Sequence, residues 1–276
     1  MTENTPRHGI FRSFVDFLRL TKYRWDFARN YLSAFGLVGA IRLLHLMHMS
    51  GREKGEIIEI RHPALVAPLF LRFGTSDISV FESIFVWRQY ALKFATPPKT
   101  ILDGGGNIGL SVVWFSTHFP DAEILVVEPN AANYELLLQN MATFRNVKTL
   151  QAGIWSRDCL VRVKQEDVRP DSFSFEPCEA GQDGATQAFD IATLADRFVM
   201  PTLDLVKLDI EGAEEELFTN RFESWLHMAN MIVVECHSAP IRETVRKALR
   251  APEWRESQCG ENDVFVRATN ATTANV

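Results

Sequence analysis

The sequence has little cysteine and no excess of positive charge, and both shortages narrow the classes of protein it can encode. Its 276 residues include four cysteines, Cys159, Cys178, Cys236 and Cys259, none of them in a C-x-x-C pair. This wide spacing argues against a zinc ribbon or a disulfide scaffold and predicts a reducing, cytoplasmic environment. The net charge of −6 supplies no overall basic field, so we expect no nucleic-acid partner.

The sequence also lacks a signal-peptide pattern and an uninterrupted apolar run of membrane-spanning length. One apolar segment, residues 31–49, is broken by Arg42, His45 and His48, which are costly in a bilayer. Two interpretations stay open: a helix that covers part of the main domain, or an interfacial helix that makes a peripheral membrane contact. Residues 1–54 hold nine Lys or Arg against four Asp or Glu, a net +5, so the rest of the chain carries −11.

What the sequence does contain is an alternation of short apolar strands and helices beyond residue 98. Strands are predicted at 100–103, 123–127, 147–154, 203–209, 231–235 and 263–267, and helices at 110–118, 131–144, 214–222 and 241–250. This alternation predicts an α/β protein with a doubly wound, mostly parallel sheet and helices on both faces.

The composition, 46% hydrophobic and 23% charged, suits one large globular domain with an extension. We divide the chain into a helical N-terminal extension (1–56), a helix and strand segment (57–98), the main domain (99–268) and a flexible tail (269–276). In the second segment, Ser76 or Asp77 is expected to cap a helix that runs to Phe94. The sequence does not indicate an oligomeric state.

A glycine-rich loop follows the first strand of the main domain. The stretch ILDGGGNIGL, residues 101–110, holds Gly104, Gly106 and Gly109 in a G-x-G-x-x-G pattern. Glycines let a backbone approach a ligand, and the next helix points free N–H groups toward it. Glu128 ends the second strand, 19 residues beyond Gly109, where a carboxylate can accept hydrogen bonds from both ribose hydroxyls. The loop therefore predicts an adenosine-containing cofactor, either NAD or S-adenosylmethionine.

Asp103, directly before the glycines, favours one of these cofactors. A dinucleotide would bring two negative phosphates to this carboxylate, and the repulsion would grow in a low-dielectric cleft. S-adenosylmethionine brings an ammonium and a sulfonium, both positive, so the same carboxylate attracts it. We therefore expect S-adenosylmethionine, with an NAD-dependent oxidoreductase as the alternative.

Acidic residues and a histidine follow the fourth and fifth strands, whose ends should open toward the same cleft. Asp209 and Glu211 lie in the stretch DIEGAE, and His237 follows Glu235. An alcohol that accepts a methyl group must lose a proton, and His237 or one of these acids is a candidate base. Asp209 or Glu211 could instead cap the next helix, and His237 could be a loop residue. We expect no metal, because nothing in the spacing requires one.

Two blocks of the sequence resemble a known family. ILDGGGNIGLSVVWFSTHFPDAEILVVEPN, followed by LDLVKLDIEGAEEELF, is similar to the FkbM-type S-adenosylmethionine-dependent methyltransferases, and GTSDISVFESIF just upstream is also typical of them. The likeness covers about Thr75 to Glu235 and leaves residues 1–54 outside. It implies a seven-stranded class I methyltransferase (Rossmann-like) fold and O-methylation of a small-molecule, glycan-like or polyketide-like acceptor.

The resemblance also implies roles for individual residues. Asp209, Glu211 and His237 become the catalytic candidates, and Gly105 stands where family members often have alanine, which looks like a small change. The residues implied for the donor are Asp103, Gly104, Gly106, Asn107 and Gly109 at the methionine part, Glu128 and Asn130 at the ribose, and Gly153 and Ile154 at the adenine.

Overall fold

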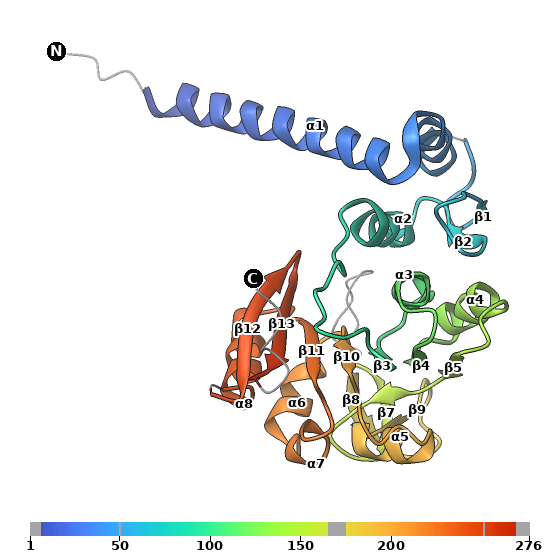
Figure 1. The fold of residues 1–276 in the computed structure, drawn as a ribbon, viewed down its shortest axis with the longest axis vertical. Helices are drawn as coiled ribbons and strands as arrows, with labels where there is room; N and C mark the ends of the chain where they lie inside the picture. The colour runs from blue at the N-terminus through green and yellow to red at the C-terminus, as the bar shows by residue number, and fades with distance from the viewer. Residues whose placement is uncertain (1–6, 50, 165–174, 251, 269–276) are drawn as a thin grey trace.

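The computed structural model describes residues 7–49, 51–164, 175–250 and 252–268 (Figure 1). The expected tail at 269–276 lies outside these residues. The upstream part contains these elements: α1 (Arg7–Leu44), the π-helical turn η1 (His45–Met49), β1 (Ile57–Ile60), β2 (Leu69–Arg72), α2 (Ser76–Phe81) and the π-helical turn η2 (Glu82–Val86). β1 and β2 pair as an antiparallel hairpin.

A seven-stranded sheet follows, in the order β12-β13-β11-β10-β3-β4-β5. Its strands are β3 (Thr100–Gly104), β4 (Glu123–Val127), β5 (Val147–Leu150), β10 (Leu205–Leu208), β11 (Met231–Glu235), β12 (Trp254–Cys259) and β13 (Asn262–Arg267). β13 is antiparallel to both neighbours, and the pairs from β11 to β5 are parallel. The predicted doubly wound, mostly parallel fold is confirmed. The strand order reverses between β3 and β10, whose carboxyl ends flank the crevice where such sheets bind ligands.

Alternating side chains along each strand build two cores, one on each face of the sheet. In β11, Met231 and Val233 pack into the first core and Ile232 and Val234 into the second. Figure 1 shows α2, α3 and α4 on one side of the sheet and α5, α6 and α7 on the other. The helices that follow η2 are α3 (Leu110–His118), α4 (Ala131–Met141), α5 (Ile191–Arg197), α6 (Glu214–Thr219), α7 (Glu223–Leu226) and α8 (Ala239–Ala248). Burial on both faces explains why these strands read as continuous apolar runs.

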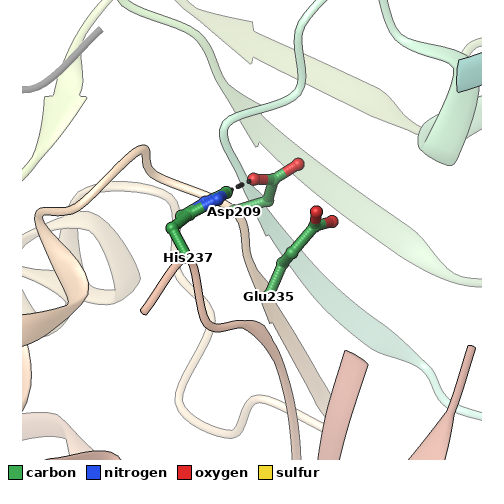
Figure 2. Close-up of side chains that lie close together, drawn as sticks. All are labelled: Asp209, Glu235 and His237. Carbon is green, nitrogen blue, oxygen red and sulfur yellow. Dashed lines mark ion pairs between the residues drawn. The ribbon is translucent and has the colours of Figure 1, made fainter. Parts of the chain in front are cut away.

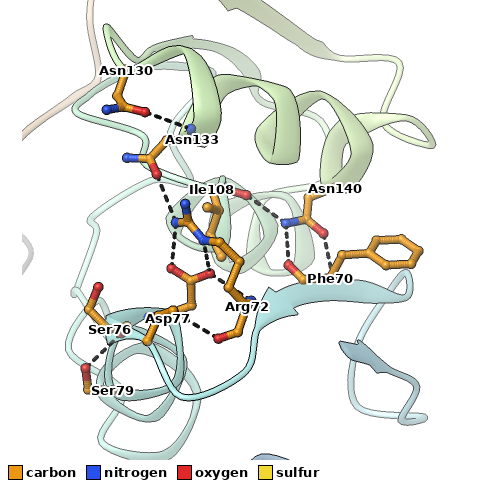
Figure 3. A network of polar contacts seen from close by, with 10 residues as sticks. Phe70, Arg72, Ser76, Asp77, Ser79, Ile108, Asn130, Asn133 and Asn140 are labelled. Carbon is orange, nitrogen blue, oxygen red and sulfur yellow. Dashed lines mark hydrogen bonds and ion pairs between the residues drawn. The ribbon is translucent and has the colours of Figure 1, made fainter. Parts of the chain in front are cut away.

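A polar network fixes the upstream segment to the main domain (Figure 3). Arg72 forms a two-pronged ion pair with the fully buried Asp77, at 2.8 Å for both contacts, and donates to Asn133 of α4 at 2.9 Å. Asn140 of α4 exchanges two hydrogen bonds with the backbone of Phe70 and donates to the carbonyl of Ile108 at 2.8 Å. β2, α2, α4 and the glycine loop are therefore tied together.

The structure corrects several predicted boundaries. Thr75, and neither Ser76 nor Asp77, caps α2, because its hydroxyl accepts from the Asp77 amide at 3.2 Å. The helical run ends at Val86 instead of Phe94, since Arg88 adopts a left-handed conformation at φ 56°.

Farther along the chain, the predicted strand at 147–154 is two strands in different sheets. β5 ends at Leu150 and β6 (Gly153–Ile154) joins a small sheet with β7 (Cys159–Val163), β8 (Phe175–Cys178) and β9 (Thr186–Phe189), in the order β6-β9-β7-β8. β12 is an additional strand that the sequence did not predict. The predicted helix at 214–222 is the shorter α6, followed by α7.

Candidate active site

The glycine loop is tightly packed against the two neighbouring strand ends. The amides of Gly105 and Gly106 both donate to the carbonyl of Val127 at 3.0 Å. A Cβ on Gly105, whose φ is 72°, would lie 1.7 Å from the carbonyl oxygen of Asp209, and one on Gly106 would lie 2.1 Å from Val126. An alanine, which family members often have at the position of Gly105, would therefore need a backbone shift here, because the carbonyl of Asp209 occupies the space of the methyl group.

Asp103 lies behind this loop, fully buried, and faces a buried lysine. Its Oδ1 is 3.1 Å from Nζ of Lys207, and its Oδ2 accepts a hydrogen bond from Ser111. Lys207 also donates to the carbonyl of Gly105 at 2.7 Å. Burial lowers the pKa of Lys207, but Asp103, Tyr90 and Asp209 more than offset this and hold that pKa above its usual value. The prediction that Asp103 attracts the cofactor's positive charge stays a prediction; in the structure this carboxylate is buried and is paired with Lys207.

The first of two cavities at this edge of the sheet, the Glu128 cavity, has a volume of about 410 Å³. Glu128 is 5% exposed and accepts backbone hydrogen bonds from Asn107 at 2.8 Å and Asn130 at 2.9 Å. Burial raises the pKa of Glu128, and those hydrogen bonds oppose the shift. The residues that line it include Gly105, Asn107, Glu128, Asn130, Asn133, Gly153, Ile154, Trp155, Phe175, Gly184, Asp209 and Glu211.

The second, the Glu235 cavity, has a volume of about 470 Å³ and lies on the other side of the loop. Gly105, Asn107, Asp209 and Glu211 line both cavities, so these four residues mark their junction. Its polar lining residues are Ser76, Ser79, Ser83, Gln89, Tyr90, Asn107, Ser111, Lys207, Asp209, Glu211, Glu235, His237 and Glu261. This cavity is built jointly by α2, η2 and the ends of β10 and β11.

The turn after β10 is held by Glu214 instead of by the acids expected to cap the helix. Oε1 of Glu214 accepts from the Ile210 amide at 2.8 Å, and its Oε2 accepts from the Gly212 amide at 2.7 Å. Glu214 is fully buried, whereas Asp209 and Glu211 keep their carboxylates at the cavities. Glu211 adopts a left-handed backbone conformation at φ 53°, an uncommon one for a glutamate.

Asp209, Glu235 and His237 converge at the carboxyl ends of β10 and β11 (Figure 2). His237 Nε2 lies 3.2 Å from Asp209 Oδ1 and 3.7 Å from Glu214 Oε1. The hydrogen bond to Asp209 raises the pKa of His237 to about 9, so the imidazole is protonated at neutral pH. Burial works to raise the pKa of Asp209, but Lys207 and His237 hold it below its usual value.

Glu211 and Glu235, beside Asp209 and His237, have raised pKa values, in contrast to the lowered pKa of Asp209. Burial, reinforced by the charge of Asp209, raises the pKa of Glu211 to about 7 and that of Glu235 to about 7. Both carboxyl groups therefore exchange protons near neutral pH, which suits a general base. Ligand atoms of Asp209, Glu235 and His237 all lie within 4.8 Å of one another, close enough to share one cation. That the site binds no metal therefore stays a prediction.

The structure brings most of the predicted site residues together. Asn107, Glu128, Asn130, Gly153 and Ile154 line the Glu128 cavity, Gly106 and His237 line the Glu235 cavity, and Asp209 and Glu211 line both. Asp103, Gly104 and Gly109 are not among the lining residues and support the loop from behind. The segment between β6 and β10 contributes Phe175 and Gly184 to the Glu128 cavity.

Sequence reasoning missed the polar wall of the Glu235 cavity that precedes the main domain. Ser76, Ser79 and Ser83 recur at helical spacing, and that periodic polar stripe is the signal that could have revealed it. Glu214 was also detectable, because it stands four residues after Ile210 at the start of a helix. Gln89 and Glu261 carry no comparable pattern.

Comparison with known proteins identifies the family. A model of the methyltransferase FkbM domain matches residues 103–260. Methyltransferase sdnD from Sordaria araneosa is 26% identical over 203 residues, 59% of this chain and 78% of that protein. Methyltransferase 1 from Beauveria bassiana (strain ARSEF 2860) is 24% identical over 208 residues, 63% of this chain and 83% of that protein.

Among solved structures, methyltransferase FkbM from Methylobacillus flagellatus KT aligns with 67% of this chain and 47% of that chain, at 13% identity and a TM-score of 0.46. The family match sets aside the NAD-dependent alternative for the glycine loop.

The residues at the two cavities fit S-adenosylmethionine. The buried carboxylate of Glu128 can hold the ribose hydroxyls, with Gly153 and Ile154 beside the adenine. Oδ1 of Asn107 is buried without a hydrogen-bond partner among the described residues, so it can accept a bond from an ammonium group. The acids at the junction supply the negative charge that a sulfonium favours. The chain belongs to the FkbM methyltransferase family, and S-adenosylmethionine is its methyl donor.

Proposed function

We propose that the chain is an O-methyltransferase that methylates a hydroxyl group of a small-molecule, glycan-like or polyketide-like acceptor in the Glu235 cavity. S-adenosylmethionine supplies an electrophilic methyl group, so the protein has to place the acceptor oxygen and receive its proton. The observation that carries the proposal is Glu211, a carboxyl group at the junction of the two cavities with a pKa raised to about 7.

Glu211 is the proton acceptor in this proposal. An alcohol is a poor nucleophile unless a base takes its proton as the new bond forms. A carboxylate with an ordinary pKa is a weak base, but burial near Asp209 makes Glu211 a stronger one that is still substantially ionised at neutral pH. A neutral amine does not need this assistance, so a base at the junction supports an alcohol as the acceptor.

Asp209 and His237 then serve as a positioning pair. With its pKa raised to about 9, His237 carries a proton and is not available as a base at pH 7 to 8. It instead donates a hydrogen bond to Asp209, and the pair forms one wall of the Glu235 cavity. Among the candidate bases, His237 is therefore proposed to contribute its positive charge and not to accept the proton.

The wall opposite this pair supports a hydroxylated acceptor. Ser76, Ser79, Ser83 and Gln89 offer both donors and acceptors of hydrogen bonds to a polyhydroxylated molecule. An anionic acceptor is disfavoured, because Glu235 and other acids line the same cavity. All four cysteines are free, which supports the proposal of a reducing, cytoplasmic location.

The test pairs acceptors that differ only at the reacting atom. A panel of hydroxylated glycosides and polyols, and their amino analogues, is incubated with the full chain and a methyl-labelled donor, and tandem mass spectrometry locates the methyl group. We expect label on oxygen only, and a kcat for Glu211→Gln about 10²- to 10⁴-fold lower. The rise of kcat/KM with pH toward about 7 should weaken in that variant.

Glu215→Gln is the matched control, because Glu215 is exposed on the same turn and lines neither cavity. It should keep the wild-type rate. Label on nitrogen alone would contradict O-methylation, and a fully active Glu211→Gln would contradict the assignment of the base.

A further inference from the structure

The N-terminal helix presents an apolar face that no described part of the chain covers. Trp25 is 77% exposed, Leu37 65%, Val38 69% and Ile41 60%. The same segment is anchored to the body: Tyr31 and Phe35 are buried, the Tyr31 hydroxyl bonds to Glu82, and Phe35 stacks on Phe81. The exposure is thus a fixed property of a helix held on the body of the enzyme.

The geometry excludes a helix that crosses a bilayer. Arg24–His48 is long and apolar enough to span a membrane by length and composition. Gly36, however, leaves the helical conformation at φ 66° and divides α1 into two pieces. Only the piece before the break has the ~20 residues that a span requires. Its apolar part begins near Trp25, however, which is too close to the break at Gly36 to reach that length. Leu43 of the second piece and Met47 of the following turn η1 are buried against the body, so lipid cannot surround this part of the chain.

The positive charge around the exposed apolar residues favours an anionic lipid surface over a second copy of the chain. Arg24, Arg29 and Arg42 are exposed on the same segment, and Asp26 is its one acid. Since residues 1–54 carry +5, a second copy that packed α1 against α1 would bring like charges together. An anionic lipid surface meets both requirements, because it takes apolar side chains and attracts arginines.

The charge of the rest of the chain, beyond residue 54, favours contact with the membrane through α1. This part of the chain carries −11 and would be repelled by anionic lipid. Figure 1 shows α1 on the side of α2 away from the sheet, so contact through α1 holds the acidic body off the surface. We propose that the exposed apolar side chains of α1, which are Leu37, Val38 and Ile41 after the break at Gly36 and Trp25 before it, dock the enzyme on anionic membranes as an interfacial segment. The inference is independent of the acceptor's chemistry.

The experiment is co-sedimentation of the full chain with vesicles of phosphatidylcholine alone or with 30% phosphatidylglycerol, roughly a moderately anionic membrane. We expect binding to the anionic vesicles only, weaker at high salt. Leu37→Glu with Ile41→Glu should reduce the affinity about tenfold or more, and Arg24→Gln, Arg29→Gln and Arg42→Gln about fivefold each.

Leu138→Glu is the control, since Leu138 is an exposed leucine on α4 and should leave binding unchanged. Binding of S-adenosylhomocysteine by each variant shows that it is folded. Equal binding by the Leu37/Ile41 variant, or none by wild type, overturns the proposal. Wild-type dimers that the same variant converts to monomers would assign the face to a second copy instead.

Discussion

The two cavities meet at the same four residues but are built in different ways. The Glu128 cavity is formed largely by consecutive strand ends and the turns after them, all within the matched family domain. The Glu235 cavity draws one wall from β10 and β11 and the other from α2 and η2, which precede that domain. We therefore expect the common part of the fold to hold the shared donor and the proposed acceptor to meet a wall added upstream.

Their electrostatics differ as well. The charge of Glu128 is met by backbone amides, which suits a fixed partner bound the same way in every cycle. In the Glu235 cavity, Glu211 and Glu235 have pKa values raised to about 7, and His237 has one raised to about 9. Groups that change charge near neutral pH belong where a proton has to move.

The largest expected effect comes from the lysine that underlies the loop between the cavities. Lys207→Met leaves Asp103 fully buried without its charge partner, so we expect the free energy of unfolding to fall by about 3–5 kcal/mol. Chemical denaturation followed by circular dichroism measures this. Lys247→Met, which removes an exposed pair with Glu243, is the control and should leave stability unchanged. If the double variant Asp103→Asn, Lys207→Met is no more stable than Lys207→Met alone, the buried charge is not the cause.

The next largest effect is on donor binding, which we expect to depend on the Glu128 cavity. Glu128→Gln removes one charged acceptor from the Glu128 cavity, and we expect about 10- to 100-fold weaker binding of S-adenosylhomocysteine by calorimetry. Glu123→Gln, an exposed change at the start of the same strand, should bind normally. Unchanged affinity in Glu128→Gln would mean that this carboxylate does not hold the ribose.

The sequence indicated the Glu128 cavity because its residues lie at fixed distances along the chain. Glu128 directly follows β4, whose last four residues are apolar, and its place relative to the glycine loop follows from one β-α-β unit. Asp209, Glu211 and His237 were found for the same reason, since the ends of parallel strands share an edge. The family's sequence motif supplied the rest.

The Glu235 cavity was harder to predict because tertiary contacts assemble it. Ser76 reaches the site through the Arg72–Asp77–Asn133 network, and no local pattern indicates which helix Arg72 will contact. β12 was missed because four of its six side chains are exposed, so it lacks an apolar alternation. The pairing of Asp103 with Lys207 was not predicted, because Lys207 lies 104 positions away on a neighbouring strand.

The smallest expected effect is on the pH dependence of stability, and it tests the raised pKa of Glu235. An acid whose folded pKa is raised to about 7, from 4.5, contributes stability that is present below pH 4.5 and is lost as pH rises through 7. Glu235→Gln cannot ionise, so at pH 8 it should be more stable than wild type, by about 1 kcal/mol after allowance for solvent screening. That is about 2–4 °C in Tm by differential scanning fluorimetry, and the gain should vanish at pH 5.

Glu179→Gln provides the comparison, because Glu179 is an exposed carboxylate that lines neither cavity and should show no gain at either pH. A stabilisation of Glu235→Gln that is equal at pH 5 and pH 8 would show that packing is responsible. A gain confined to pH 8 would show that the enzyme keeps a charge in the Glu235 cavity at a cost in stability. Such a cost is expected at a site that must accept a proton, and not in the Glu128 cavity, where backbone amides already satisfy the carboxylate.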